Sequence, residues 1–244
     1  MPTNKIRIGE AAEIIGVSIQ TLRNWERVGK LRSTRSAGGQ RYYDAEEVRR
    51  LAVDIEGFGW AWASSAQAPY LPDEYYCERS DRFTSRLTKM STVFLQAFGA
   101  TPANTDLISL LTLVVGEIGD NSFVHNLGSW PDVLGIFFAY DVNKRLIVLA
   151  DRGRGVLTTL QNIRPDLALD TDALRVAFTE VISGRDPEKR GNGLKVVRGV
   201  AESNPIDLLF RSGLGIVQIP GLPRRMQISM ANENVRGTFA TIKI

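Results

Sequence analysis

The strongest restriction on the fold comes from residues 105–126, TDLISLLTLVVGEIGDNSFVHN, where apolar and polar stripes alternate at helical spacing. The apolar stripe follows one side of a helix and consists of Leu107, Leu110, Leu111, Val114, Val115 and Ile118. On another side stand Glu117, Asn121 and His125, because four residues advance a helix by one turn plus about 40 degrees. Three such side chains can converge on one ligand, although the same spacing also suits an ordinary solvated face.

Two glycine motifs follow downstream. Asp151 ends a strand-like pair, VLGIFFAYDV and KRLIVLADRG, and opens the sequence DRGRG, whose Gly153 and Gly155 would let a nucleotide approach the backbone. Further on, RGNGLKVVRGVAE places Gly191 and Gly193 before an apolar-periodic helix. The free amide groups at the start of that helix can hold phosphate oxygens. Each motif alone is weak.

The order of these elements is more specific. ExxxN on a helix, DxGxG after a strand, GxGL opening a helix and Gly237-Thr238 in a final strand resemble the ATP-binding fold of the GHKL superfamily. The resemblance covers about residues 81–244. It implies an α/β sandwich, and the strand-like runs IDLLF, GLGIVQIP, MQISM and TFATIKI are expected to complete a mixed sheet backed by helices.

The GHKL resemblance also implies roles for individual residues, with ATP and Mg²⁺ as cofactors. Asn121 would coordinate Mg²⁺, Glu117 would activate a water or hydroxyl nucleophile, and Asp151 would accept a hydrogen bond from the adenine amino group, supported by Thr238. His125 would lie near the phosphates, with packing or capping as its alternative role. The other implied nucleotide-binding residues are Gly153, Gly155, Arg190, Gly191, Gly193 and Leu194. Between Gly155 and Gly191 we expect a lid, including a helix in LDTDALRVAFTEVISGR and a charged tip; ordinary loop solvation is the alternative.

Residues 1–54 have a different character. They hold the entire net charge of +3, with 10 basic against 7 acidic side chains, and a basic surface of this kind suits a polyanion. The spacing predicts a helix over IGEAAEII, a break at GVS, a second helix capped by Ser18, a hairpin with a diglycine tip, and a third helix after Asp44.

TLRNWERVGKL followed by GGQRYYDAEEV resembles the winged helix-turn-helix of MerR-type regulators and of excisionase-like modules. The resemblance implies double-stranded DNA as partner, with the second helix in the major groove and the wing on the backbone. The expected DNA-binding residues are Gln20, Arg23, Asn24, Arg27, Arg35, Arg41 and Tyr42. The alternative is a small helical domain used for protein contacts.

Residues 55–80 are expected to be an aromatic-rich linker, part of which packs on a domain or a second subunit, because they contain glycines, prolines and no heptads. We expect a homodimer without the coiled coil usual in MerR-type regulators. The start of the chain has no apolar signal core, and the longest apolar run is too short for a bilayer. Together with the single cysteine, Cys77, these features predict a cytoplasmic protein without a membrane partner.

The predicted fold class is therefore α+β, and the predicted function is a DNA-binding transcriptional regulator whose ATP-binding domain senses nucleotide or hydrolyses it slowly. Two alternatives remain open, an anti-sigma-type serine/threonine protein kinase with a protein substrate and an ATP-dependent module of mobile-element or phage-response systems. Because His125 is the only histidine and lies on the nucleotide helix, a classical histidine kinase is excluded.

Overall fold

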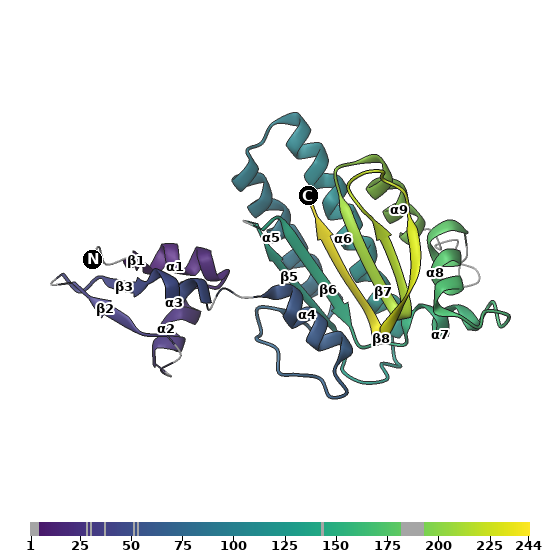
Figure 1. Cartoon of the computed structure of the whole chain (residues 1–244), viewed down its shortest axis with the longest axis horizontal. Helices are drawn as coiled ribbons and strands as arrows, with labels where there is room; N and C mark the ends of the chain where they lie inside the picture. The colour runs from purple at the N-terminus through teal and green to yellow at the C-terminus, as the bar shows by residue number, and fades with distance from the viewer. Residues whose placement is uncertain are drawn as a thin grey trace. The chain divides into compact units, whose positions relative to one another are not determined.

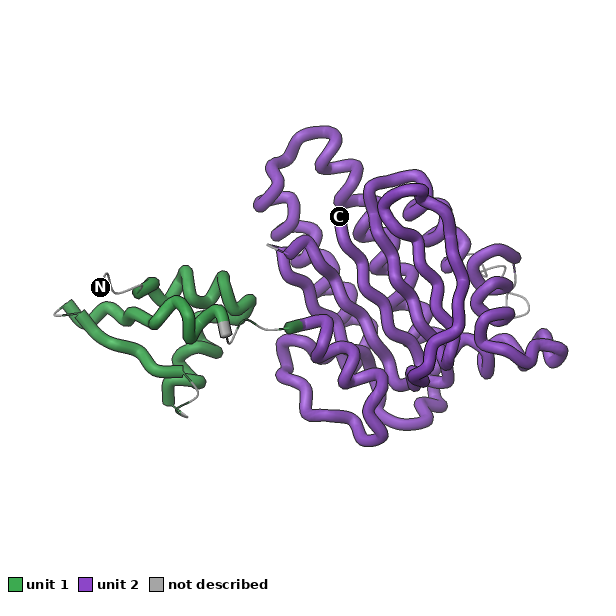
Figure 2. Tube along the Cα trace, viewed as in Figure 1, with its two compact units in different colours: residues 1–54 green, residues 55–244 purple. Residues whose placement is uncertain are grey.

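The computed structural model describes residues 5–27, 29, 31–36, 38–50, 52, 54–142, 144–181 and 193–244 (Figure 1). The chain divides into two compact units, Met1–Asp54 and Ile55–Ile244 (Figure 2). Both units combine helices with antiparallel sheets, so the fold class is α+β.

The described part of the first unit contains short helices around a three-stranded sheet in the order β1-β3-β2. Its elements are β1 (Lys5–Arg7), α1 (Ile8–Ile15), α2 (Ile19–Arg27), β2 (Ser33–Arg35), β3 (Arg41–Asp44) and α3 (Ala45–Arg50). The helix-turn-helix and the hairpin lie where they were predicted. The short strand β1, which pairs with β3, was not predicted.

Local capping explains the boundaries of these helices. Gly16, with φ 75°, ends α1 in the left-handed conformation that glycine adopts readily. Ser18 Oγ accepts a hydrogen bond from Thr21 N at 3.0 Å at the start of α2, and Asp44 Oδ1 accepts bonds from Glu46 N and Glu47 N at the start of α3. The caps predicted at Ser18 and Asp44 are therefore confirmed.

The second unit is built on a five-stranded sheet in the order β4-β5-β6-β8-β7. Its strands are β4 (Tyr76–Cys77), β5 (Ile136–Asp141), β6 (Leu146–Asp151), β7 (Asp207–Ile219) and β8 (Gln227–Lys243). Every pairing in this order is antiparallel, so the expectation of a mixed sheet is wrong. The four strand-like runs near the carboxyl terminus form two long strands, β7 and β8, whose pairing shifts register between Ser212 and Gly215 instead of ending there.

Helices cover both faces of this sheet (Figure 1). They are α4 (Ile55–Ser64), α5 (Ser80–Phe98), α6 (Pro102–Asn126), α7 (Gly155–Gln161), α8 (Asp170–Thr179) and α9 (Gly193–Ser203). The main core lies between one sheet face and α5, α6, α8 and α9, with Phe83, Leu111, Phe138, Phe178 and Val197 all buried.

The opposite face of the sheet carries α4, where a linker was expected. Gly59 brings this helix so close to the sheet that an added Cβ would lie 2.6 Å from Val148 Cγ1. Trp60 meets Phe239 edge to face, with ring centroids 5.4 Å apart. Trp60 therefore packs on the sheet, which agrees with the expectation that part of this segment packs on a domain. Residues 55–64 belong to the second unit rather than to a tether.

The helix α6 is long and apolar enough to cross a membrane by length and composition, although the longest uninterrupted apolar run is shorter. Its buried residues Leu111, Val114, Val115 and Ile118 belong to the core of the second unit. We therefore interpret it as a core helix.

Candidate functional site

The polar stripe of α6 meets the start of α9. An added Cβ at Gly193 would lie 2.6 Å from Oε2 of Glu117 and 3.2 Å from Nδ2 of Asn121, and both side chains are half-buried. A larger residue at Gly193 would displace Glu117. Two motifs that lie far apart in the sequence thus share one place, where the first amide groups of a helix stand beside a carboxylate and a carboxamide.

Asp151, at the end of β6, is also tied to α6. Its Oδ2 accepts hydrogen bonds from Ser122 Oγ at 2.8 Å and from Thr238 Oγ1, while its Oδ1 accepts one from Gly153 N at 2.7 Å. Ser122 follows Asn121 directly on α6, and Thr238 pairs with Asp151 across β6 and β8. The carboxylate therefore joins the helix, the sheet and the DRGRG loop.

Burial dominates the electrostatics of Asp151, whose residue is 1% exposed. Loss of solvation raises the pKa of this carboxyl group above its ordinary value of 3.8, and the hydrogen bonds from Thr238, Ser122 and Gly153 oppose that rise. The net direction is upward, so the folded protein holds this negative charge at a cost.

The two glycines of the DRGRG loop are needed for contacts within the chain. An added Cβ at Gly153 would lie 2.1 Å from Nδ2 of Asn126, and one at Gly155 would lie 2.9 Å from Oγ of Ser212. Gly155 also has φ 74°. The expected reason for these glycines was the approach of a nucleotide. The structure gives a different reason, which is that their missing side chains make room for Asn126 and Ser212.

Three polar residues of this site were missed in the sequence. Asn126 donates to Ser122 O at 2.8 Å and accepts from Arg154 N at 2.9 Å, so it joins the end of α6 to the loop. Ser212 accepts from Val156 N at 2.9 Å and donates to Gly237 O at 2.8 Å. Ser122 holds Asp151. Only Asn126 had a signal, since an asparagine at the end of an apolar helix favours a cap.

The remaining predicted nucleotide-binding residues are His125, Leu194, Arg190 and Gly191. His125 is exposed one turn beyond Asn121 on α6, and Leu194 packs against the main core. Arg190 and Gly191, with the expected lid tip, lie outside the described residues. The helix that was expected within the lid corresponds to α8, which ends at Thr179, earlier than expected.

Among the described residues, this site offers few ligands for a metal ion. No group of three or more His, Cys, Asp or Glu side chains suited to a metal occurs among the described residues. Asn121 alone offers one carboxamide oxygen, which fits Mg²⁺ only if phosphate oxygens and water complete its six ligands.

In the first unit, α2 presents a polar face to solvent. Leu22 is buried, whereas Gln20, Arg23, Asn24 and Arg27 are all exposed, as is Arg35 on β2. This arrangement agrees with the predicted reading face. Exposed bases on one helix and the adjoining wing are what a phosphate backbone requires.

Arg41 has a structural partner inside this unit. Its Nε donates to Oε2 of Glu26 at 2.8 Å, and both side chains are about three-quarters buried. A hydrogen bond from Ser33 lowers the pKa of Glu26, and Arg41 adds to that effect. Arg41 therefore joins the wing to α2 and neutralises Glu26, in addition to any contact with DNA. Tyr42, half-buried beside it, donates to Gln40 at 3.2 Å.

A helix-turn-helix followed by a β wing, with a basic exposed helix, defines the first unit as a DNA-binding domain. Comparison with known proteins is more specific, because residues 7–43 match the family described as MerR family regulatory protein. The first unit is thus a MerR-type helix-turn-helix domain.

A curated relative supports this assignment. The nodulation protein NolA of Bradyrhizobium elkanii is 50% identical over 46 residues, which are 18% of this chain and 21% of NolA. The match spans about a fifth of that relative's length. No solved structure gives a significant match.

Proposed function

We propose that this chain is a DNA-binding transcriptional regulator whose second unit is a GHKL-type domain that binds ATP with Mg²⁺. One juxtaposition supports the nucleotide site. Glu117 and Asn121 of α6 lie against the first residue of α9, and Ser122, which follows Asn121 on α6, is bonded to the buried Asp151. A metal-binding carboxamide therefore lies beside the start of α9, and the next residue of α6 is bonded to a carboxylate that is able to accept a hydrogen bond from an amino group.

Each residue would have a separate task at this site. Asn121 would hold Mg²⁺, which supplies neutralisation of phosphate charge when it is bound. The amide groups at the start of α9 would receive phosphate oxygens, and Gly193 would keep that approach open. An adenine amino group would share the carboxylate of Asp151 with Ser122 and Thr238. Because the family match ends at residue 43, these assignments depend on geometry and motif order.

Regulation would follow if nucleotide binding changes the affinity of the protein for DNA. Coupling free energies of about 1 to 3 kcal/mol change an affinity by roughly 5- to 150-fold, so slow hydrolysis or simple binding would suffice. We infer action in the cytoplasm, as expected for a MerR-type regulator, and as a homodimer, because paired units read paired half-sites.

A serine/threonine protein kinase of the anti-sigma type is the second candidate. The half-buried Glu117, one turn from Asn121, is suited to take a proton from a hydroxyl group. Transfer of labelled phosphate from ATP to another protein would favour the kinase. ATP-dependent DNA affinity without such transfer would favour the regulator.

Titration calorimetry of the full chain with ATP tests the nucleotide site. Asn121→Ala should weaken ATP binding in Mg²⁺ at least about tenfold, which corresponds to about 1.4 kcal/mol. In EDTA the two proteins should bind ATP equally. Asn232→Ala, at an exposed position of β8, is the matched control and should bind like the unmodified chain. Equal affinities of Asn121→Ala and the unmodified chain in Mg²⁺ would contradict the metal assignment.

A further inference from the structure

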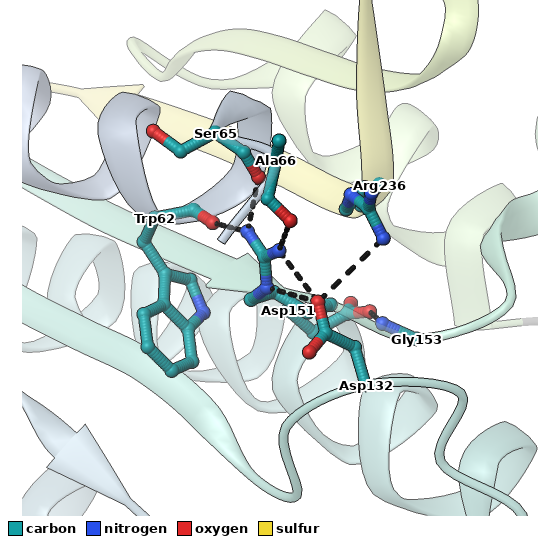
Figure 3. A network of polar contacts seen from close by, with 8 residues as sticks. Trp62, Ser65, Ala66, Asp132, Asp151, Gly153 and Arg236 are labelled. Atoms are coloured by element: carbon teal, nitrogen blue, oxygen red, sulfur yellow. Dashed lines mark hydrogen bonds and ion pairs between the residues drawn. The ribbon is translucent and has the colours of Figure 1, made fainter. Parts of the chain in front are cut away.

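Arg152 is the largest fully buried side chain among the described residues, with 0% exposure. Its Nη1 donates to the carbonyl oxygens of Trp62 and Ser65, and its Nη2 donates to Ala66 O at 3.3 Å (Figure 3). Its Nε donates to Asp132 Oδ2 at 2.7 Å. A charged group without exposure is thus held by three main-chain carbonyls and one carboxylate.

The partners of Arg152 come from two segments of the chain. Trp62 lies in the last turn of α4, whose final carbonyls have no partner within the helix, and Ser65 and Ala66 follow that helix directly. Asp132 lies in the segment after α6, and Arg236 of β8 lies 3.7 Å from the same carboxylate. Arg152 therefore joins the end of α4 to the DRGRG loop and to the segment after α6.

Arg152 lies in the DRGRG loop, directly after Asp151, and the two side chains bond to different parts of the second unit. Asp151 is bonded to Ser122 and Thr238 on the side of α6, whereas the next residue reaches the end of α4, which covers the opposite sheet face. Because the two residues are adjacent, a shift of the loop that changes the contacts of Asp151 also acts on the backbone that carries the guanidinium. The carbonyls at the end of α4 would then lose or change their donor.

The chain then links α4 to the DNA-binding domain. α4 begins at Ile55, directly after Asp54, the last residue of the first unit. We propose that Arg152 is a positioning residue that transmits occupancy of the proposed nucleotide site to the end of α4, the helix of the second unit that directly follows the first unit in the chain. This inference rests on the proposed ATP site.

The test is hydrogen exchange of the full chain with and without saturating Mg·ATP, read in peptides covering residues 60–70. In the unmodified chain, ATP should change exchange in these peptides. In Arg152→Gln at saturating ATP, that change should be lost, while the nucleotide-dependent change around residues 117–126 remains. A merely structural arginine would alter exchange equally with and without ATP.

Two further variants keep the test decisive. Asp132→Asn keeps the shape of the partner and should reduce the ATP-dependent change at residues 60–70, even if Arg152→Gln fails to fold. Arg79→Gln, which removes an exposed arginine paired with Asp81, should leave the change intact. Calorimetric ATP binding with no change at residues 60–70 would overturn this inference alone. Absence of ATP binding would contradict the proposed function and this inference together.

Discussion

Asp151 shows how a single residue can cost stability and still hold a site together. It is 1% exposed, yet it accepts hydrogen bonds from a helix, a strand and its own loop. Burial raises the pKa of this group. Its folded form therefore binds a proton more tightly than its unfolded form does, and ionisation opposes folding.

Asp151→Asn should reveal this cost through pH. Above the ordinary value of 3.8, the free energy of unfolding of the unmodified chain should fall relative to that of the variant as pH rises. Urea unfolding at several pH values measures the difference. Asp166→Asn should give the opposite sign, because Arg164 lowers the pKa of that exposed carboxyl group. If the free energy of unfolding of the unmodified chain instead rises with pH relative to that of Asp151→Asn, the burial argument is contradicted.

At the residue scale, the sequence predicted individual site residues but not the hydrogen bonds that join them. Glu117, Asn121, Asp151 and Thr238 were chosen from motif order. The network of Arg152 could not be predicted, because its carbonyl partners at Trp62, Ser65 and Ala66 carry no side-chain signature. Main-chain acceptors far away in sequence become visible only when the fold places them.

At the scale of elements, α6 depends on one close approach. Gly119 lies where an added Cβ would be 2.2 Å from the ring of Phe83 on α5, a fully buried side chain. Gly116, one turn earlier, meets only Leu87 Cδ2 at 3.4 Å. Of the two glycines of GEIGD, only Gly119 is therefore required for close packing, although the two look alike in the sequence.

Substitution by alanine at each position should therefore change the free energy of unfolding differently. Gly119→Ala should lower the free energy of unfolding by about 1 to 3 kcal/mol, because the buried ring cannot give way. Gly116→Ala should be neutral or should stabilise the helix by about 0.5 to 1 kcal/mol, since alanine restricts the unfolded chain. Urea denaturation of the two variants tests this, and equal effects would show that α5 and α6 do not approach at Gly119.

The elements that were mispredicted share a physical cause. The segment IEGFGWAWAS has two glycines and little helical periodicity, so α4 was not expected. Its helical state is favoured by packing, with Gly59 and Trp60 against the sheet. β7 was divided at its glycines, although pairing with β8 continues through a register shift. In both cases tertiary contacts outweigh local preference.

At the scale of the whole molecule, charge and motif order indicated which unit binds DNA and which unit would hold the nucleotide site. The basic excess lies in residues 1–54, and the match to the MerR family lies within them. The acidic and polar groups of the proposed nucleotide site all lie in the second unit. The sequence could not predict the proposed coupling between the two units, because the proposal depends on α4 and on the partners of Arg152.

The most direct test of this account is the DNA affinity of the full chain with and without Mg·ATP. Fluorescence anisotropy should use a duplex from upstream of its own gene and a shuffled duplex at fixed salt. We predict that ATP changes the affinity for the first duplex at least about fivefold. Arg23→Ala should weaken binding in both conditions and lower its salt dependence. Equal affinity with and without Mg·ATP would contradict a nucleotide-controlled regulator.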